Sequence, residues 1–176
     1  MRTVPGPYQL SIWPWLQSAG DGDTPLHLLN LDTGQQMPIA RSAAELVACT
    51  PQWCRSIGQS ADGTATRFDV MHPDGSDRRR IAGANAAAVS SDVAFLDRFE
   101  VLTVTVAGKP DLEVYDIGRR TTTVVARDVG MVLCRGGMLW WSTGDQPGGE
   151  GVEQWHTVDL RTLTSTRPPA PSPTAR

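Results

Sequence analysis

The sequence predicts an all-β fold on three observations. Short segments rich in β-branched and aromatic residues are separated by turn residues about every 8–12 positions. No segment offers a helix of more than two turns. Asp- and Gly-containing turns recur at a nearly constant distance, because Gly34, Gly75, Gly118 and Arg161 lie 41, 43 and 43 residues apart. This period is typical of a four-stranded propeller blade. We therefore predict a β-propeller of four-stranded antiparallel blades, with about four blades present.

The turns that mark the repeats are predicted to be structural rather than functional. Their residues are Asp32, Gly34, Asp74, Gly75, Asp116, Gly118 and Asp159. They divide the chain into an N-terminal extension, four blades and a proline-rich tail. The corresponding ranges are 1–7, then 8–41, 42–83, 84–127 and 128–166, then 167–176. The tail is expected to be disordered, because it has nothing to bury.

The second blade shows the most regular strand pattern. Its predicted strands are Glu45–Cys49, Cys54–Gln59, Thr66–His72 and Arg78–Ala82. In the third blade we expect Asp92–Leu96, Phe99–Val106, Leu112–Asp116 and Thr121–Ala126. In the fourth we expect Met131–Cys134, Met138–Thr143, Val152–Asp159 and a weak Arg161–Thr166. Ser42–Leu46 and Ala84–Val89 are short helix candidates.

The first blade is expected to be incomplete. Its predicted strands are Tyr8–Trp13, Pro25–Leu31 and Met37–Ala40, which leaves no residues for an innermost strand. In a closed propeller each blade covers the apolar face of its neighbour. We therefore predict an open arc, which is either part of a larger propeller or one half of an assembled one. Two terminal blade faces would then expose apolar surface.

Composition excludes several classes of protein. The net charge is −3 and the pI about 5.5, which argues against non-specific nucleic-acid binding. No apolar run approaches the roughly 20 residues of a membrane helix. Met1–Pro7 holds one basic residue with no apolar segment behind it, so no secretory signal is predicted in this chain.

Cys49 and Cys54 flank a four-residue turn and face each other across a predicted hairpin. They are either a disulfide, which would indicate an oxidising compartment, or two half-buried thiols. Cys134 is expected to be a core thiol.

Asp69–Ser76 followed by Arg79–Ala82 resembles the repeat of TolB-like β-propellers, in which a Met-x-x-Asp-Gly-Ser turn precedes an Arg-x-Leu/Ile strand. Cys49–Cys54 and Leu139–Gly144 also resemble uncharacterised bacterial members of that group. The resemblance covers about residues 8–166 and is strongest in the second repeat. It implies a propeller fold and, more loosely, an extracytoplasmic binding role, with a cytoplasmic location as the alternative. Such families usually have six or more blades.

The sequence offers no catalytic or metal-binding constellation. His27, His72 and His156 lie at different offsets from their turns, so the repeat does not bring them together. No zinc-ligand spacing, nucleophile elbow or phosphate loop is present. The segment Asp21-Gly22-Asp23-Thr24 lacks the further carboxylates of a calcium loop. We expect no enzyme activity, no metal and no cofactor.

One rim of the disc is predicted to be acidic. The loops that join second to third strands must emerge on one face, and they contain Lys109 as their sole cation. Their carboxylates are Asp21, Asp23, Asp62, Asp145 and Glu150. This rim would suit a basic partner or a cation, although polar loops are also expected for solubility alone.

Arginine and tryptophan have structural interpretations. Arg78-Arg79-Arg80 would protect an outermost strand from pairing with other chains. The six tryptophans are expected between blades, and Trp140 and Trp141 must point to opposite faces of their strand.

The sequence therefore predicts a non-enzymatic propeller module that binds or scaffolds a protein or a cell-envelope component. The missing blades of a larger propeller are the other expected partner. The alternatives are the propeller domain of a larger peptidase-like hydrolase and a carbohydrate-binding propeller.

Overall fold

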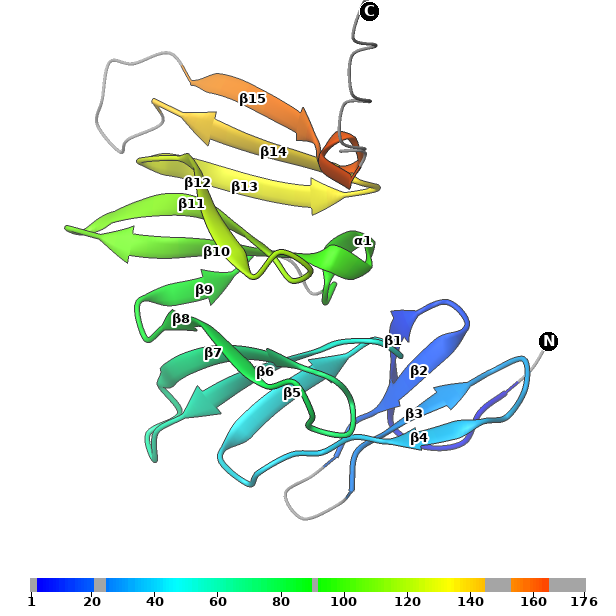
Figure 1. Cartoon of the computed structure of the whole chain (residues 1–176). Coiled ribbons are helices and arrows are strands. Elements are labelled where there is room, and N and C mark those ends of the chain that lie inside the picture. The colour runs from blue at the N-terminus through cyan, green and yellow to red at the C-terminus, as the bar shows by residue number, and fades with distance from the viewer. Residues whose placement is uncertain (1–2, 21–24, 90–91, 145–152, 165–176) are drawn as a thin grey trace, which may run out of the picture.

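A computed structural model describes residues 3–20, 25–89, 92–144 and 153–164. Four antiparallel sheets follow one another along the chain, and in each the strands are neighbours in sequence order (Figure 1). This is the arrangement of consecutive propeller blades. The prediction of an all-β fold built from antiparallel blades is confirmed.

The first three sheets have four strands each. Blade 1 contains β1 (Tyr8–Ile12), β2 (Trp15–Ser18), β3 (His27–Asn30) and β4 (Gln36–Pro38). Blade 2 contains β5 (Glu45–Cys49), β6 (Cys54–Gln59), β7 (Ala65–Met71) and β8 (Arg79–Gly83). Blade 3 contains β9 (Ala86–Ala88), β10 (Phe99–Val106), β11 (Lys109–Asp116) and β12 (Thr121–Ala126).

The fourth sheet has three strands among the described residues. Blade 4 contains β13 (Val129–Arg135), β14 (Met138–Thr143) and β15 (Gln154–Asp159), followed by a 3-10 helix, η1 (Leu160–Thr164). The turn between β13 and β14 consists of Gly136 and Gly137, both at positive φ. Two consecutive residues at positive φ form the tight turn that matches strand twist, and glycine adopts it without steric cost.

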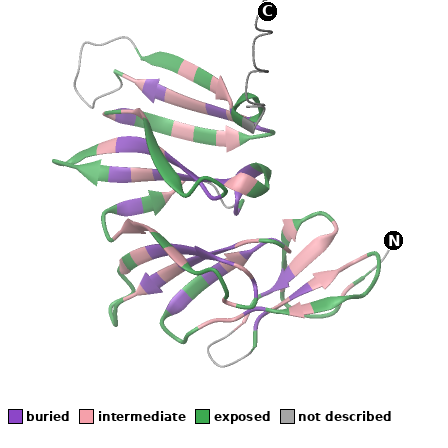
Figure 2. Cartoon of the chain, in the orientation of Figure 1, coloured by how far each residue is buried: buried purple, intermediate pink, exposed green. Residues whose placement is uncertain are grey.

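Four apolar clusters fill the three interfaces between consecutive blades. Leu28 of blade 1 packs with Val47, Cys54 and Met71 of blade 2. Blades 2 and 3 meet through Phe68 and Val70 against Leu102, Val104 and Tyr115. Blades 3 and 4 meet through Val101, Leu112 and Val114 against Val129 and Leu139. Burial is therefore concentrated where neighbouring sheets face each other (Figure 2).

The arc is open. No sheet and no apolar cluster of the described residues joins blade 4 to blade 1. Figure 1 shows blades 2, 3 and 4 stacked face to face and blade 1 turned away at one end of the stack. The outward sheets of blades 1 and 4 keep large apolar side chains exposed, among them Leu10, Met131 and Leu133.

The prediction of an incomplete first blade is wrong. Tyr8–Ile12 is the innermost strand, and a second strand, Trp15–Ser18, follows at once. The two strands reverse direction around Trp13 and Pro14. The predicted strand Tyr8–Trp13 ended before Pro14, and no strand was predicted at Trp15–Ser18. Proline removes a backbone donor and favours turns, so Pro14 marks a tight reversal, after which the chain returns at once as β2.

The third blade also differs from expectation. Its innermost strand is Ala86–Ala88, inside the segment that was a helix candidate. Asp92–Leu96, which was predicted to be a strand, is an irregular connection that ends in the short element α1 (Phe95–Arg98). Alanine is a poor strand former, so local propensity favoured the wrong assignment, whereas pairing of β9 with β10 determines the strand.

The prediction of a weak fourth strand at Arg161–Thr166 is wrong for the residues described, because Leu160–Thr164 forms the 3-10 helix η1. Asp159 explains this change of direction. Its carboxylate accepts a hydrogen bond from the Arg161 N–H at 3.0 Å, and its carbonyl accepts one from the Thr162 hydroxyl at 2.7 Å. These bonds stabilise a turn instead of a strand.

The other repeat turns use their acidic residues in the same way. Asp74 accepts bonds from the Ser76 N–H and hydroxyl, and Asp116 accepts one from the Arg119 N–H. In the first blade the side chain that organises the turn is Asn30, which accepts a bond from the Asp32 N–H.

A partly buried ionic network lies on blade 2. The Glu45 carboxylate accepts hydrogen bonds from Arg78 at 2.6 Å and Arg67 at 2.9 Å, and both arginines also contact Asp69. Gly58 lies between Glu45 and Arg67 on β6. A Cβ there would be 3.0 Å from the Arg67 Cγ, so glycine makes room for the crossing side chains. The prediction that Arg78 protects the sheet edge is therefore wrong, because its side chain points inward to Glu45 and Asp69.

This network predicts an acid dependence of stability. The hydrogen bond from Arg78 is the main cause that lowers the pKa of Glu45 from 4.5 to about 2. The ionised form is therefore favoured in the folded state, and its contribution is complete above pH 4.5 and is lost as the pH falls toward 2. Urea unfolding of Glu45→Gln should show a lower free energy of unfolding than the parent at neutral pH, by about 1 kcal/mol after solvent screening. The two proteins should converge near pH 2, and a constant difference across this window would contradict the prediction.

Candidate functional site

The candidate site is a groove on the concave side of the arc, formed by three adjoining cavities. We call it the axial groove. The first cavity, of about 270 Å³, and the second, of about 240 Å³, share Gln9, Gln17, Ala48 and Arg55. The second shares Ser11, Thr50, Asp92 and Val93 with the third, of about 390 Å³. The groove therefore runs along β1 and β5 and reaches all four blades.

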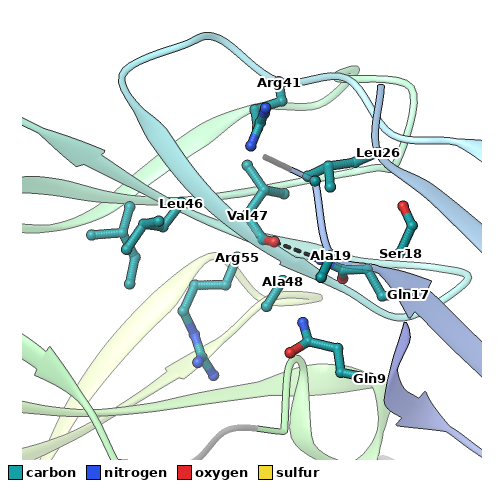
Figure 3. A pocket seen from close by; sticks show the side chains of 12 residues that line it. Gln9, Gln17, Ser18, Ala19, Leu26, Arg41, Leu46, Val47, Ala48 and Arg55 are labelled. Atoms are coloured by element: carbon teal, nitrogen blue, oxygen red, sulfur yellow. Dashed lines mark hydrogen bonds between the residues drawn. The ribbon is translucent and has the colours of Figure 1, made fainter. Parts of the chain in front are cut away.

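The first cavity lies between blades 1 and 2. Figure 3 shows Arg41 on one side of it and the amide of Gln9 on the other, with Leu46 and Arg55 along the β5 side. Leu46 is 55% exposed and faces this opening. The cavity thus combines an apolar wall with arginine and amide groups.

Gln17 holds the free edge of β5. Thr50 and Trp53 are bonded across the β5–β6 turn, so the alternation of the antiparallel ladder directs the polar groups of Val47 and Cys49 away from β6. The Gln17 side chain donates to the Val47 carbonyl at 2.8 Å and accepts from the Cys49 N–H at 2.7 Å. The Ser11 hydroxyl donates to the Cys49 carbonyl. Side chains of blade 1, instead of another strand, therefore satisfy the outward backbone hydrogen-bonding groups of β5, the edge strand of blade 2.

Gln17→Leu should lower the free energy of unfolding by about 2 kcal/mol, because two buried backbone groups lose their partners. Gln9→Leu is the matched control, since Gln9 lines the same cavity but is exposed. It should leave stability within about 0.5 kcal/mol of the parent. Chemical denaturation measures both, and equal effects of the two variants would contradict the role of Gln17.

A buried ion pair forms the floor of the groove between blades 2 and 3. The Arg55 Nε donates to the Glu100 carboxylate at 2.7 Å, and the two side chains are 6% and 0% exposed. Arg55 also donates to the Asp92 carbonyl at 2.8 Å, and Glu100 accepts from the Ala94 N–H at 2.7 Å. The pair thus fixes the irregular segment that follows β9.

That segment brings an unusual backbone to the third cavity. Ala94, Leu96 and Asp97 all have φ near +50° to +60°, a region that side chains disfavour. Buried Val93 and Phe95 anchor the segment, whereas Leu96 stays 40% exposed beside the cavity. Strained residues of this kind persist when the surrounding structure holds them, and they concentrate at binding sites.

The groove exposes a run of large apolar side chains. Leu10 is 66% exposed and Ile12 46%, and Leu46 and Leu96 line the same cavities on blades 2 and 3. We call these four residues the groove patch. Exposed apolar side chains gathered in one groove with a polar surround are typical of a protein-interaction site.

The predicted acidic rim lies mostly outside the described residues. Asp21, Asp23, Asp145 and Glu150 are outside them, and Asp62 is the member that the structure places. The Asp62 carboxylate accepts bonds from the Ser60 hydroxyl and the Thr64 N–H, which lower its pKa to about 2. It therefore stabilises its own loop. Lys109 pairs with Asp128.

The histidines remain apart, each beside an aromatic ring of its own blade. His27 contacts Tyr8, His72 stacks on Trp53 at 4.2 Å, and His156 stacks on Trp141 at 5.4 Å. Arg79 lies over Trp53 as well. These are packing contacts between strands and turns.

Of the two alternatives for Cys49 and Cys54, the structure shows the disulfide, and it is buried in the core between blades 1 and 2. Burial raises the pKa of the Cys134 thiol to about 12, so this cysteine is an unreactive thiol at neutral pH.

In the described parts of the chain, no group of three His, Cys, Asp or Glu residues is placed to hold a metal ion. Across the same ranges, no helix combines the length and apolarity needed to cross a membrane.

The axial groove had no signal in the sequence. Gln17 and Val47 are 30 residues apart, and Arg55 and Glu100 are 45 apart.

No protein-family model matches the chain, and no curated protein matches it in sequence. Among solved structures the chain is similar to TolB from Acinetobacter baumannii, with 14% sequence identity and a TM-score of 0.48. The match covers 84% of this chain and 38% of the TolB chain, so this chain spans well under half the length of that protein. The blade architecture itself rests on the four sheets described above.

Proposed function

We propose that this protein is a non-enzymatic propeller module that binds a protein partner in the axial groove. The observation that carries the proposal is the groove patch, in which four exposed large apolar side chains from three blades line the adjoining cavities of one groove. Such residues are costly to leave in water, and protein partners are the ligands that cover them over this length.

The polar surroundings support a peptide-like partner. The exposed amide of Gln9 lines the groove beside the apolar row and can bond to main-chain groups. The buried disulfide supports an oxidising, extracytoplasmic compartment, where such bonds persist. A cell-envelope component is therefore a suitable class of partner.

Site-specific photo-crosslinking in the cell of origin tests the proposal. A photoreactive residue replaces Ile12 in one variant and Val106 in another, because Val106 is also a half-exposed apolar residue but lies outside the groove. We expect a crosslinked protein from position 12 and none from position 106. Adding Leu96→Asp to the first variant should abolish that crosslink. Equal crosslinking at both positions would overturn the groove as the binding site.

A further inference from the structure

Among the described residues, blade 4 ends with an open strand edge. Blades 1, 2 and 3 have a fourth strand, whereas in the described part of blade 4 the strand β15 pairs with β14 alone. In Figure 1, β15 lies at the end of the arc opposite to blade 1 and away from β1 and β5. An unpaired edge offers main-chain donors and acceptors at strand spacing, and another strand is the ligand that matches them.

The ladder geometry identifies the residues that face outward. The Leu160 N–H bonds to the Gly137 carbonyl at 2.9 Å, and β14 and β15 pair without a register shift. Alternation along an antiparallel ladder then directs His156 and Val158 toward β14. It directs the N–H and C=O of Trp155, Thr157 and Asp159 away from the sheet.

This edge lacks the protection seen on the outer strands of the other blades. Strand β4 contains Pro38, β8 begins with Arg79 and Arg80, and the pairing of β12 contains a register shift. Proline, charge and bulges each hinder pairing with another chain. Strand β15 has no proline, lysine or arginine, and Asp159 at its end is already paired with Arg161.

We propose that β15 pairs antiparallel with β15 of a second copy, joining two blades into one six-stranded sheet across a two-fold axis at Thr157. In this register Thr157 faces Thr157 of the second copy, and Trp155 faces Asp159 in both directions. Threonine pairs across strands are favourable, and no like charges oppose one another. Such a two-fold contact gives a dimer and no larger assembly, because the β15 edge of each copy is then occupied.

The neighbouring surface favours the same occupant. Trp155 on this edge strand is 48% exposed. A second sheet edge beside Trp155 would shield this residue from water on both copies. The residues that follow η1 are poor donors for the same edge, since Pro168, Pro169, Pro171 and Pro173 lack N–H groups. The contact is independent of the axial groove, so it goes beyond the proposed function.

The first test is the mass in solution of the full, oxidised chain. We expect a species of twice 19.0 kDa by light scattering at high protein concentration. Thr157→Pro removes the outward N–H without removing a bond to β14, and it should give the monomer mass with an unchanged circular dichroism spectrum. Thr157→Val keeps the N–H and should remain dimeric. A parent protein that stays monomeric, or a folded Thr157→Pro variant that stays dimeric, would overturn the proposal.

Hydrogen exchange gives a second measurement that needs no variant. The amides of Trp155 and Thr157 should exchange slowly in the concentrated protein and rapidly after dilution, whereas those of His156 and Val158 should be slow in both. Slow exchange of Trp155 and Thr157 at every concentration would mean that a segment of the same chain covers the edge. That result would also overturn the proposal.

Discussion

Arg55→Met is expected to lower the free energy of unfolding by about 3–5 kcal/mol, the largest effect of any single substitution considered for this protein. The Glu100 carboxylate is completely buried, and Arg55 is its charge partner at 2.7 Å. Removing the guanidinium leaves a charge between blades 2 and 3 without compensation. It also releases the Asp92 carbonyl at the start of the irregular segment.

The double variant Arg55→Met/Glu100→Leu should recover most of this loss, because an apolar pair in place of a buried ion pair is often neutral. Arg67→Met is the matched control. Arg67 also binds carboxylates on blade 2, but its side chain is 39% exposed and Arg78 shares its partners. Its loss should cost about 1 kcal/mol or less. Urea unfolding of the parent, Arg55→Met, Glu100→Leu and the double variant completes the cycle, and additive effects of the two single substitutions would contradict a coupled pair.

The positions of the turns that divide the chain into blades could be predicted where the turn depends on neighbouring residues alone. Asp74 and Gly75 form a turn with a positive φ and an aspartate that bonds to Ser76, and both features follow from residue type. The same reasoning failed at Pro14 and at Ala86–Ala88. In those places the strands are defined by partners, and alanine and proline carry little strand signal of their own.

The axial groove could not be predicted, for a related reason. Each of its supports is a contact between residues far apart in sequence, such as Gln17 with Val47 and Arg55 with Glu100. Ala94, Leu96 and Asp97 adopt left-handed conformations, which are usually found at glycine. Because none of them is glycine, no residue type in the sequence indicates the irregular segment. The disulfide was the exception, because both cysteines flank one short turn.

Loss of the disulfide is expected to destabilise the protein by about 2–4 kcal/mol, the second largest effect. Cys49 and Cys54 are directly opposite on β5 and β6 and almost fully buried against Leu28 and Met71. Closing a short loop contributes on the order of 2 kcal/mol by chain entropy alone. The bond also stiffens the strand that carries the bonds from Gln17 and Ser11, so its loss should loosen the axial groove.

The Cys49→Ala/Cys54→Ala variant and the reduced parent should both show this loss in urea unfolding, while Cys134→Ala serves as the cysteine control. Thiol titration in denaturant gives an independent count, since the chain has three cysteines. One reactive thiol is expected in the unreduced protein and three after reduction. Three thiols without reductant would show that the bond is absent. In the folded protein Cys134 should react slowly, because burial keeps its thiol protonated, so modification at that position reports unfolding of the core between blades 3 and 4.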